Sequence, residues 1–239
     1  MKPQQLLDAY TIQARLSPAL FVILPIGIAI VAWFPQKFTG WGLLVGLATS
    51  CGTALLLAEF GRDSGKRKEP DLFALWGGTP TTQLLRHKDP RIDAYTKQRY
   101  HSTLARLTGL PLPTEQEEAD DPEDAERKYE SCVRYLRETT SKDKARFHRV
   151  FKELVSYGLR RNLWGMKPLG LTAAAIGIVA TIPTIALTWG RIPDAPAPVV
   201  ALILNGLFFV GWIAWITPDW VRVTAFSYAE RLLAACDDL

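Results

Sequence analysis

The residues best suited to bind a ligand lie in the middle of the chain, between positions 75 and 101. This stretch combines glycines and threonines with basic, histidine and aromatic residues. Backbone amides and hydroxyls donate hydrogen bonds, cations neutralise phosphates, and aromatic rings stack on bases. A turn beside a solvated helix face near anionic lipid is the alternative interpretation. The mixture predicts a nucleotide-type ligand site formed by Trp76, Thr81, Arg86, His87, Lys97, Arg99, Tyr100 and His101.

The pattern for metal or nucleophilic chemistry is much weaker. The three histidines, His87, His101 and His148, are not spaced as metal ligands with a carboxylate. The three cysteines are too far apart for a zinc motif or a disulfide framework. There is no glycine-rich phosphate loop and no Gly-x-Ser-x-Gly elbow. We therefore expect no catalytic residue, no metal and no cofactor, and a lipid-acting enzyme using His87 or His101 is only a weaker hypothesis.

Four long apolar runs flank this polar segment, although the mean hydropathy of the whole chain is close to zero. A helix needs about 20 apolar residues to cross the ~30 Å hydrocarbon core of a bilayer. Each run is edged by aromatic residues, which suit the membrane interface. The first run is too long for a cleaved signal peptide. The sequence predicts an integral membrane protein with spans at 16–34, 41–58, 168–189 and 197–216.

The distribution of basic residues predicts the orientation of these spans. Lysines and arginines gather beside the second and third spans, whereas the hairpin tips carry only Lys37 and Arg191. The positive-inside rule then puts both termini and the central segment in the cytoplasm. The predicted parts are an N-terminal hairpin at 1–61, a cytosolic domain at 62–167, a second hairpin at 168–217 and a cytosolic helix at 218–239.

The cytosolic segment shows helical spacing and no strand pattern. Asp93 is placed to cap a helix that stops at Gly109, and Asp121-Pro122 marks the start of another. Ser141 is the next predicted cap, and residues 110–120 are predicted to be a linker. The fold class is therefore all-α, with two transmembrane hairpins and an inserted helical domain.

Both ends of the chain also have helical patterns. Thr217-Pro218 restarts a helix as the fourth span ends, and its shallow apolar side favours packing on the cytosolic domain over lying on the membrane. Residues 4–14 are predicted to form a short helix before the first span.

Small and polar residues inside the spans allow two interpretations. Buried polar groups in a membrane either join helices or line a pathway, and small residues four apart let helices approach closely. The first interpretation is helix packing, and the second is the weakly polar lining of a pore assembled from several copies. The residues concerned are Gly42, Gly46, Glu59, Thr181, Thr184 and Asn205.

Two stretches, 84–89 with 96–101 and 157–168, resemble a group of bacterial four-span proteins of unassigned activity. The order of hairpin, cytosolic domain and hairpin is similar to that of membrane effectors in antiphage defence systems, including those that answer cyclic nucleotides. The resemblance implies a cyclic nucleotide or a soluble protein as the partner of the cytosolic domain.

Two functions follow as hypotheses. The first is an oligomeric inner-membrane effector of a bacterial antiphage system, in which the cytosolic domain senses a ligand or partner and the spans form a pore or perturb the membrane. The alternative is a membrane anchor, scaffold or sensor subunit that recruits a soluble protein. Membrane lipids and further copies of the chain are the expected partners. Nucleic acid is not expected, because the net charge is only +4.

Overall fold

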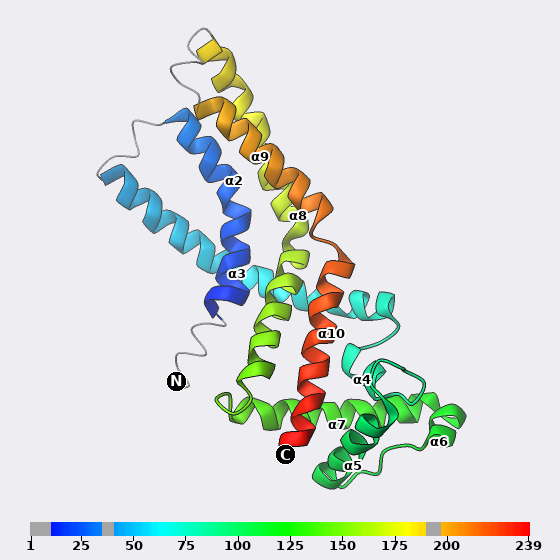
Figure 1. Cartoon of the computed structure of the whole chain (residues 1–239). Coiled ribbons are helices and arrows are strands. Elements are labelled where there is room, and N and C mark those ends of the chain that lie inside the picture. The colour runs from blue at the N-terminus through cyan, green and yellow to red at the C-terminus, as the bar shows by residue number, and fades with distance from the viewer. Residues whose placement is uncertain (1–10, 35–40, 190–196) are drawn as a thin grey trace. The chain divides into compact units, whose positions relative to one another are not determined.

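The computed structural model describes residues 11–34, 41–189 and 197–239, and the side chains of residues 12–34, 52–189 and 197–239. These residues are helical and contain no strand, which confirms the all-α prediction. The elements, drawn in Figure 1, are η1 (Thr11–Leu16), α2 (Ser17–Trp33), α3 (Trp41–Trp76), α4 (Pro80–Leu85), α5 (Ala94–Thr108), α6 (Glu115–Asp120), α7 (Pro122–Lys142), α8 (His148–Thr188), α9 (Ala197–Ala214), α10 (Pro218–Ala234) and η4 (Ala235–Asp238).

The described residues divide into two compact units. The apolar unit lies within residues 11–68 and 158–221, and the polar unit comprises residues 69–157 and 222–239. The predicted domain borders lie at 61/62, 167/168 and 217/218, whereas the two units meet at 68/69, 157/158 and 221/222. The apolar unit therefore extends beyond the predicted hairpins and includes the basic residues that flank them. Helices α3, α8 and α10 each contribute residues to both units.

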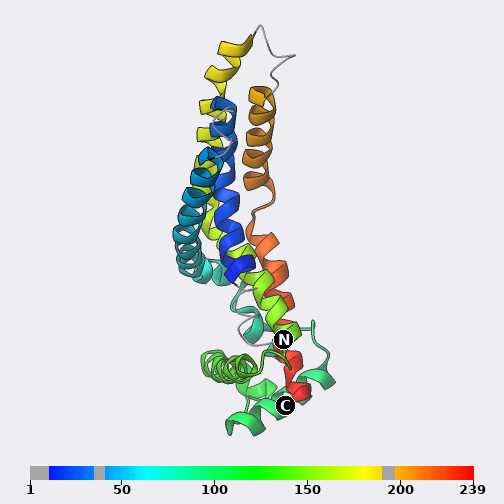
Figure 2. The same cartoon turned by 90° about the vertical axis from the view of Figure 1, so that its left-hand side faces the viewer.

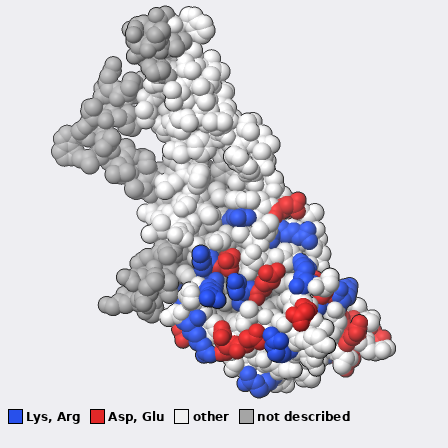
Figure 3. Space-filling model, in the orientation of Figure 1, with Lys and Arg blue, Asp and Glu red and all other residues white. Residues whose placement is uncertain are grey.

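Three helices are long and apolar enough to cross a membrane: residues 12–33, α8 and α9. They contain the first, third and fourth predicted spans. The second predicted span coincides with the start of α3, but the side chains of residues 41–51 lie outside the described residues. On the face drawn in Figure 3, charged side chains gather over the polar unit, and the surface over α9 carries none.

Small residues and one indole hold the helices of the apolar unit together. Helices α2 and α9 lie side by side. The contact of α2 with α3 is built from Ala19, Ala54 and Ala58, all buried. Trp33 Nε1 donates to the carbonyl oxygen of Ala180 at 2.7 Å and so joins α2 to α8. Alanines bring helices close together, where dispersion contacts are strong.

Two glycines of α3 and α8 make a very close helix crossing in the apolar unit. A Cβ atom built on Gly165 would lie 2.5 Å from the backbone nitrogen of Gly65. Ser64 Oγ donates to the Gly165 carbonyl at 2.9 Å. Beside the crossing, the buried Asn162 donates from Nδ2 to the Ala14 carbonyl at 2.7 Å. The crossing therefore leaves no room for a side chain at Gly165.

A lysine of α8 closes the carboxyl end of α9. Helix α9 ends at Ala214, where its last carbonyls have no partner within the helix. Lys167 Nζ donates to the carbonyls of Ile213 at 3.2 Å and Ile216 at 2.7 Å. Helix α10 then begins at Pro218, as predicted, with Thr217 Oγ1 accepting from the Trp220 amide at 3.2 Å. A cation at this position also interacts favourably with the helix dipole.

The core of the polar unit is built from α4, α5, α7, the start of α8 and the end of α10. Its fully buried residues include Leu104, Tyr129, Leu136 and Leu232. Figures 1 and 2 show α5 and α7 beside the C-terminal half of α10. The prediction that the C-terminal helix packs on the helical domain is confirmed for residues 222–234.

The predicted helix boundaries are largely confirmed in the polar unit. Asp93 Oδ1 accepts from the Thr96 amide at 2.9 Å, and Gly109 ends α5 with a φ of 69°. Asp121 caps α7, which begins at Pro122. These side-chain oxygens accept from amides that have no partner inside the helix.

Three predictions about local structure need correction or lie outside the described residues. Ser141 is not a cap, because α7 continues through it and Asp143 accepts from the Arg146 amide at 3.0 Å instead. The predicted linker contains α6, which a capping box between Thr114 and Glu117 starts. Residues 4–10 of the predicted N-terminal helix lie outside the described residues, and 11–16 form a π-helix.

We predict that Gly165→Ala lowers the free energy of unfolding of the full chain by at least about 2 kcal/mol, because the new methyl group would meet the backbone of α3. The measurement is thermal unfolding in mild detergent. Gly206→Ala is the control, because a Cβ on Gly206 of α9 would meet nothing within 4 Å. Equal melting temperatures for the two variants would contradict the crossing.

Candidate functional site

The predicted ligand segment is a tightly bonded connection between α3 and α5. Helix α3 ends in two glycines with positive φ, Gly77 at 83° and Gly78 at 128°. The Gly78 amide donates to the Phe73 carbonyl at 2.8 Å. A Cβ on Gly78 would lie 3.0 Å from Arg86 Nη2. Glycine suits this position because it tolerates the positive φ and leaves space for the Arg86 side chain. The six-residue α4 that follows is entirely buried.

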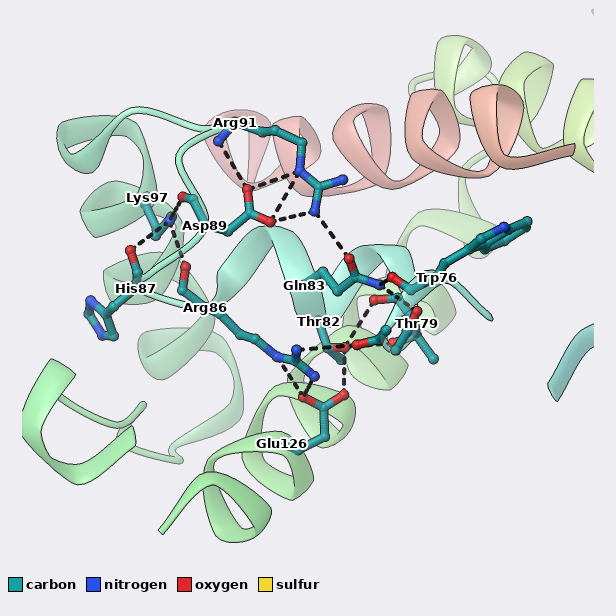
Figure 4. Close-up of polar contacts among 12 residues, drawn as sticks. Trp76, Thr79, Thr82, Gln83, Arg86, His87, Asp89, Arg91, Lys97 and Glu126 are labelled. Atoms are coloured by element: carbon teal, nitrogen blue, oxygen red, sulfur yellow. Dashed lines mark hydrogen bonds and ion pairs between the residues drawn. The ribbon is translucent and has the colours of Figure 1, made fainter. Parts of the chain in front are cut away.

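An ion pair attaches this connection to α7. Arg86 donates to Glu126 Oε2 from Nη2 at 2.8 Å and from Nε at 3.2 Å. Thr82 Oγ1 donates to the other carboxylate oxygen at 2.6 Å and lies 2.7 Å from Thr79 Oγ1. Figure 4 shows the two charged groups pointing toward each other. About a quarter of each side chain is exposed, 25% for Arg86 and 26% for Glu126.

Lys97 closes the loop that follows α4. Its Nζ donates to the carbonyls of Arg86 and Asp89, each at 2.6 Å, and of His87 at 3.4 Å. The side chain is buried, and burial lowers the pKa of Lys97 despite the nearby Asp89 and Glu118 carboxylates. An ammonium has three donors, and all three are used.

A second group of contacts surrounds Gln83. Its Nε2 donates to the Gly78 carbonyl at 2.6 Å and to the Trp76 carbonyl at 3.0 Å. Its Oε1 accepts from Arg91 Nη2 at 3.2 Å, and Arg91 is also paired with Asp89 (Figure 4). These amide and guanidinium contacts hold both ends of the connection in one conformation.

The two predicted histidines lie beside each other. Their rings meet edge to face with centres 5.0 Å apart. His87 Nε2 lies 2.9 Å from the Pro113 carbonyl, and His101 Nε2 lies 2.8 Å from the Leu85 carbonyl. Burial lowers the pKa of His101, so its ring is neutral, and a neutral ring donates to the carbonyl from Nε2. Both imidazole rings thus contact backbone carbonyl groups and stabilise the local backbone conformation.

A hollow of about 440 Å³ opens where the end of α4 faces α6 and α7. It is flanked by two cations and three carboxylates. Tyr129 donates from its hydroxyl to Glu118 Oε2 at 2.7 Å at one wall. The hollow therefore suits a neutral or cationic polar group better than a phosphate. Its charged and polar lining consists of Arg86, His87, Lys88, Glu115, Glu118, Glu126 and Tyr129.

The other predicted ligand residues lie apart from this hollow. Arg99 is exposed and pairs with Asp237 at 3.4 Å. Tyr100 is buried in the core, and Thr81 is buried in α4. Trp76 is 6% exposed, and its indole nitrogen has no hydrogen-bond partner among the described residues. Of the eight predicted residues, the structure brings together Arg86, His87, Lys97 and His101.

Glu126 and Glu118 are the site residues that the sequence did not indicate. Both belong to the acidic stretch 115–126, which looks like a solvated charge run. Their spacing carried no signal, because their partners Arg86 and His87 lie 40 and 31 residues away in the chain.

Three polar residues of the predicted spans are packed inside the apolar unit. Thr181 is fully buried and donates to the Gly177 carbonyl at 2.7 Å, while Thr184 donates to the Thr181 carbonyl at 2.6 Å. Asn205 is fully buried against Gly177, and neither its Nδ2 nor its Oδ1 has a hydrogen-bond partner among the described residues. This burial favours helix packing for these three residues.

Of the other three residues predicted for the pore or for helix packing, one is exposed and two have side-chain surroundings outside the described residues. Glu59 is exposed and pairs with Arg15 and Arg62, each at 3.2 Å. Gly42 and Gly46 lie among the residues of α3 whose side-chain surroundings are outside the described residues.

We predict a coupling energy of about 1 kcal/mol between Arg86 and Glu126 in a double-mutant cycle of Arg86→Met and Glu126→Leu, because the pair is half-buried and shares a threonine hydroxyl. Thermal unfolding of the full chain measures it. The matched control is Arg99→Met with Asp237→Asn, an exposed pair expected to give less than about 0.5 kcal/mol. Equal coupling for both pairs would contradict the assigned role of Glu126.

We predict that stability falls with acidification below about pH 6.5, the ordinary histidine value. The folded state lowers the pKa of His101, so the unfolded chain binds more protons between the folded pKa and that value, and stability rises with pH in this window. His101→Gln, which keeps a donor for the Leu85 carbonyl, should flatten the melting temperature between pH 5 and 7. The exposed His148→Gln should leave the slope unchanged.

Three observations define the candidate site. It is a preformed hollow in the polar unit, Arg86 at its wall is paired with Glu126, and the rings of His87 and His101 contact backbone carbonyls. Comparisons of the chain with protein-family models, with curated proteins and with solved structures found no match.

Proposed function

We propose that the chain is a four-span protein of the bacterial inner membrane whose polar unit lies in the cytoplasm. Three helices could cross a membrane, and the sequence of residues 41–58 supplies a fourth apolar run. The basic charge supports this orientation. Residues 62–68 and 158–167 carry seven Lys/Arg and one Asp, whereas residues 69–157 carry 15 Lys/Arg and 16 Asp/Glu. The cations flank the spans, as the positive-inside rule requires of cytoplasmic segments.

Within this topology, the protein is a membrane-anchored subunit that recruits a soluble protein partner. The burial of Thr181, Thr184 and Asn205 inside the apolar unit carries this proposal, because it leaves residues 173–187 of α8 and the whole of α9 without an exposed polar side chain. Large side chains such as Val179, Leu187 and Leu207 are exposed instead. Such helices suit anchoring in lipid.

The exposed side of α5 is the recruiting surface. Tyr95 is 81% exposed, and Arg99 and Arg106 follow on the same side, beside a hollow of about 490 Å³ that reaches η4. Tyrosine and arginine are enriched in the energetic centres of protein interfaces. A cyclic nucleotide at Arg86 is a weaker candidate, since its phosphate would compete with the Glu126 carboxylate.

The second candidate is the oligomeric pore-forming effector of an antiphage system. Asn205 favours it, because an amide buried without hydrogen bonds costs free energy that a rearranged or assembled state could recover. Since α3 and α8 each belong to both units, a change in the polar unit would act directly on the spans.

The test is native mass spectrometry of the complex extracted gently from its own membrane, combined with two variants. Under the anchor function, one or two copies carry a soluble protein, Tyr95→Ala lowers its occupancy about tenfold, and Tyr135→Ala on α7 does not. Asn205→Leu then leaves function intact. A closed ring of four or more copies whose activity is lost in Asn205→Leu would favour the effector instead.

A further inference from the structure

A long apolar groove runs along the surface of the apolar unit. It has a volume of about 770 Å³ and is formed by α2, α8, α9 and the segment that joins α9 to α10. Its floor is made by Leu163 and Trp212, which are 6% and 4% exposed. Its rims are made by Phe21, Leu207 and Trp215, which are 48%, 62% and 73% exposed. The groove is thus open along its length, and its lining is almost entirely hydrocarbon and aromatic.

The length of the groove matches one leaflet of a bilayer. On α9 it extends from Leu204 to the end of the helix beside Trp215. Eleven residue steps of helix span roughly 16 Å, and half of a ~30 Å hydrocarbon core is about 15 Å. The groove ends where the apolar span ends, so an extended acyl chain of one leaflet would fit along it.

Two basic side chains lie at this end of the groove. The Arg160 guanidinium carbon lies 4.6 Å from the centre of the Trp220 ring, and its Nη1 donates to the Trp220 carbonyl at 2.8 Å. Lys167 Nζ donates to the carbonyl of Ile216 at 2.7 Å. Trp220 and Ile216 both line the groove, and no acidic residue does. An arginine and a lysine beside interfacial tryptophans form a setting that attracts an anionic head group.

We propose that this groove binds an anionic glycerophospholipid, with one acyl chain along α9 and the phosphate near Arg160 and Lys167. An extended peptide is a poorer occupant, because its backbone amides and carbonyls would meet an apolar wall without partners. An acyl chain has no such groups. The inference rests on the membrane insertion proposed above, but not on whether the protein is an anchor or an effector.

The experiment is native mass spectrometry of the full chain released from nanodiscs that hold equal amounts of phosphatidylglycerol and phosphatidylcholine with identical acyl chains. The wild type should keep phosphatidylglycerol in preference. Arg160→Gln and Lys167→Gln should each reduce that preference about fivefold, the effect of one basic residue near an anionic surface. Lys142→Gln, an exposed cation of the polar unit, should leave it unchanged.

A groove-filling variant tests the acyl-chain half of the proposal. Gly211→Leu fills the groove beside Trp215, where the glycine has room for a Cβ, and should lower bound lipid more than about tenfold. Gly206→Leu on the same helix is the control, because Gly206 faces open space outside the groove. Leu207→Trp is a second filling variant if Gly211→Leu does not fold.

The outcomes separate this inference from the proposed function. Phosphatidylglycerol adducts that survive both filling variants, or equal retention of the two lipids by the wild type, would overturn the lipid site while leaving the membrane topology intact. A chain that never enters the nanodisc would overturn both. Loss of adducts in the filling variants and loss of preference in the charge variants would establish the site.

Discussion

The contact of Gly65 with Gly165 is the constraint on which the apolar unit depends. At this crossing the backbones of α3 and α8 touch, and a single methyl group on Gly165 would separate them. The hydrogen bond from Ser64 of α3 to the Gly165 carbonyl of α8 requires this short distance, and beside it Asn162 joins α8 to the Ala14 carbonyl of η1. Because α3 begins with the second predicted span and α8 contains most of the third, the crossing joins the two predicted hairpins.

Charged residues surround this crossing, and the structure explains why they are tolerated. Lys68 Nζ donates to the Gly165 carbonyl at 3.3 Å, and the buried Arg161 lies beside Asn162 Oδ1. Lys167 donates to one of the last carbonyls of α9, that of Ile213, and to the carbonyl of Ile216 just beyond the helix. Three of the basic residues on which the proposed orientation rests, Lys68, Arg160 and Lys167, are therefore also hydrogen-bond donors to backbone carbonyls. In the proposed topology, these residues would serve both orientation and folding.

The sequence predicted the features that depend on local chemistry. Sequence alone predicted the apolar runs of membrane length, because each is a continuous stretch of the chain. It also predicted the Asp93 and Asp121 caps and the end of α5 at Gly109, because each depends on residues within one or two helical turns. The capping box of Thr114 with Glu117 was equally local, yet the prolines around it favoured a linker. Contacts between residues far apart in the sequence could not be predicted. Nothing in the spacing of Arg86 and Glu126, or of Gly65 and Gly165, indicates that they meet.

The same limit explains why the predicted nucleotide site changes character in the structure. Arginine, lysine and histidine in one stretch predict an anion site only if their charges remain available. Here Glu126 neutralises Arg86, and Lys97 is buried, with its three donors on backbone carbonyls. With the 15 cations of residues 69–157 matched by 16 carboxylates, the excess positive charge lies in the two segments beside the spans. The two partners proposed above follow this division of charge: an anionic lipid where Arg160 and Lys167 end the apolar groove, and a protein on the mixed-charge surface of the polar unit.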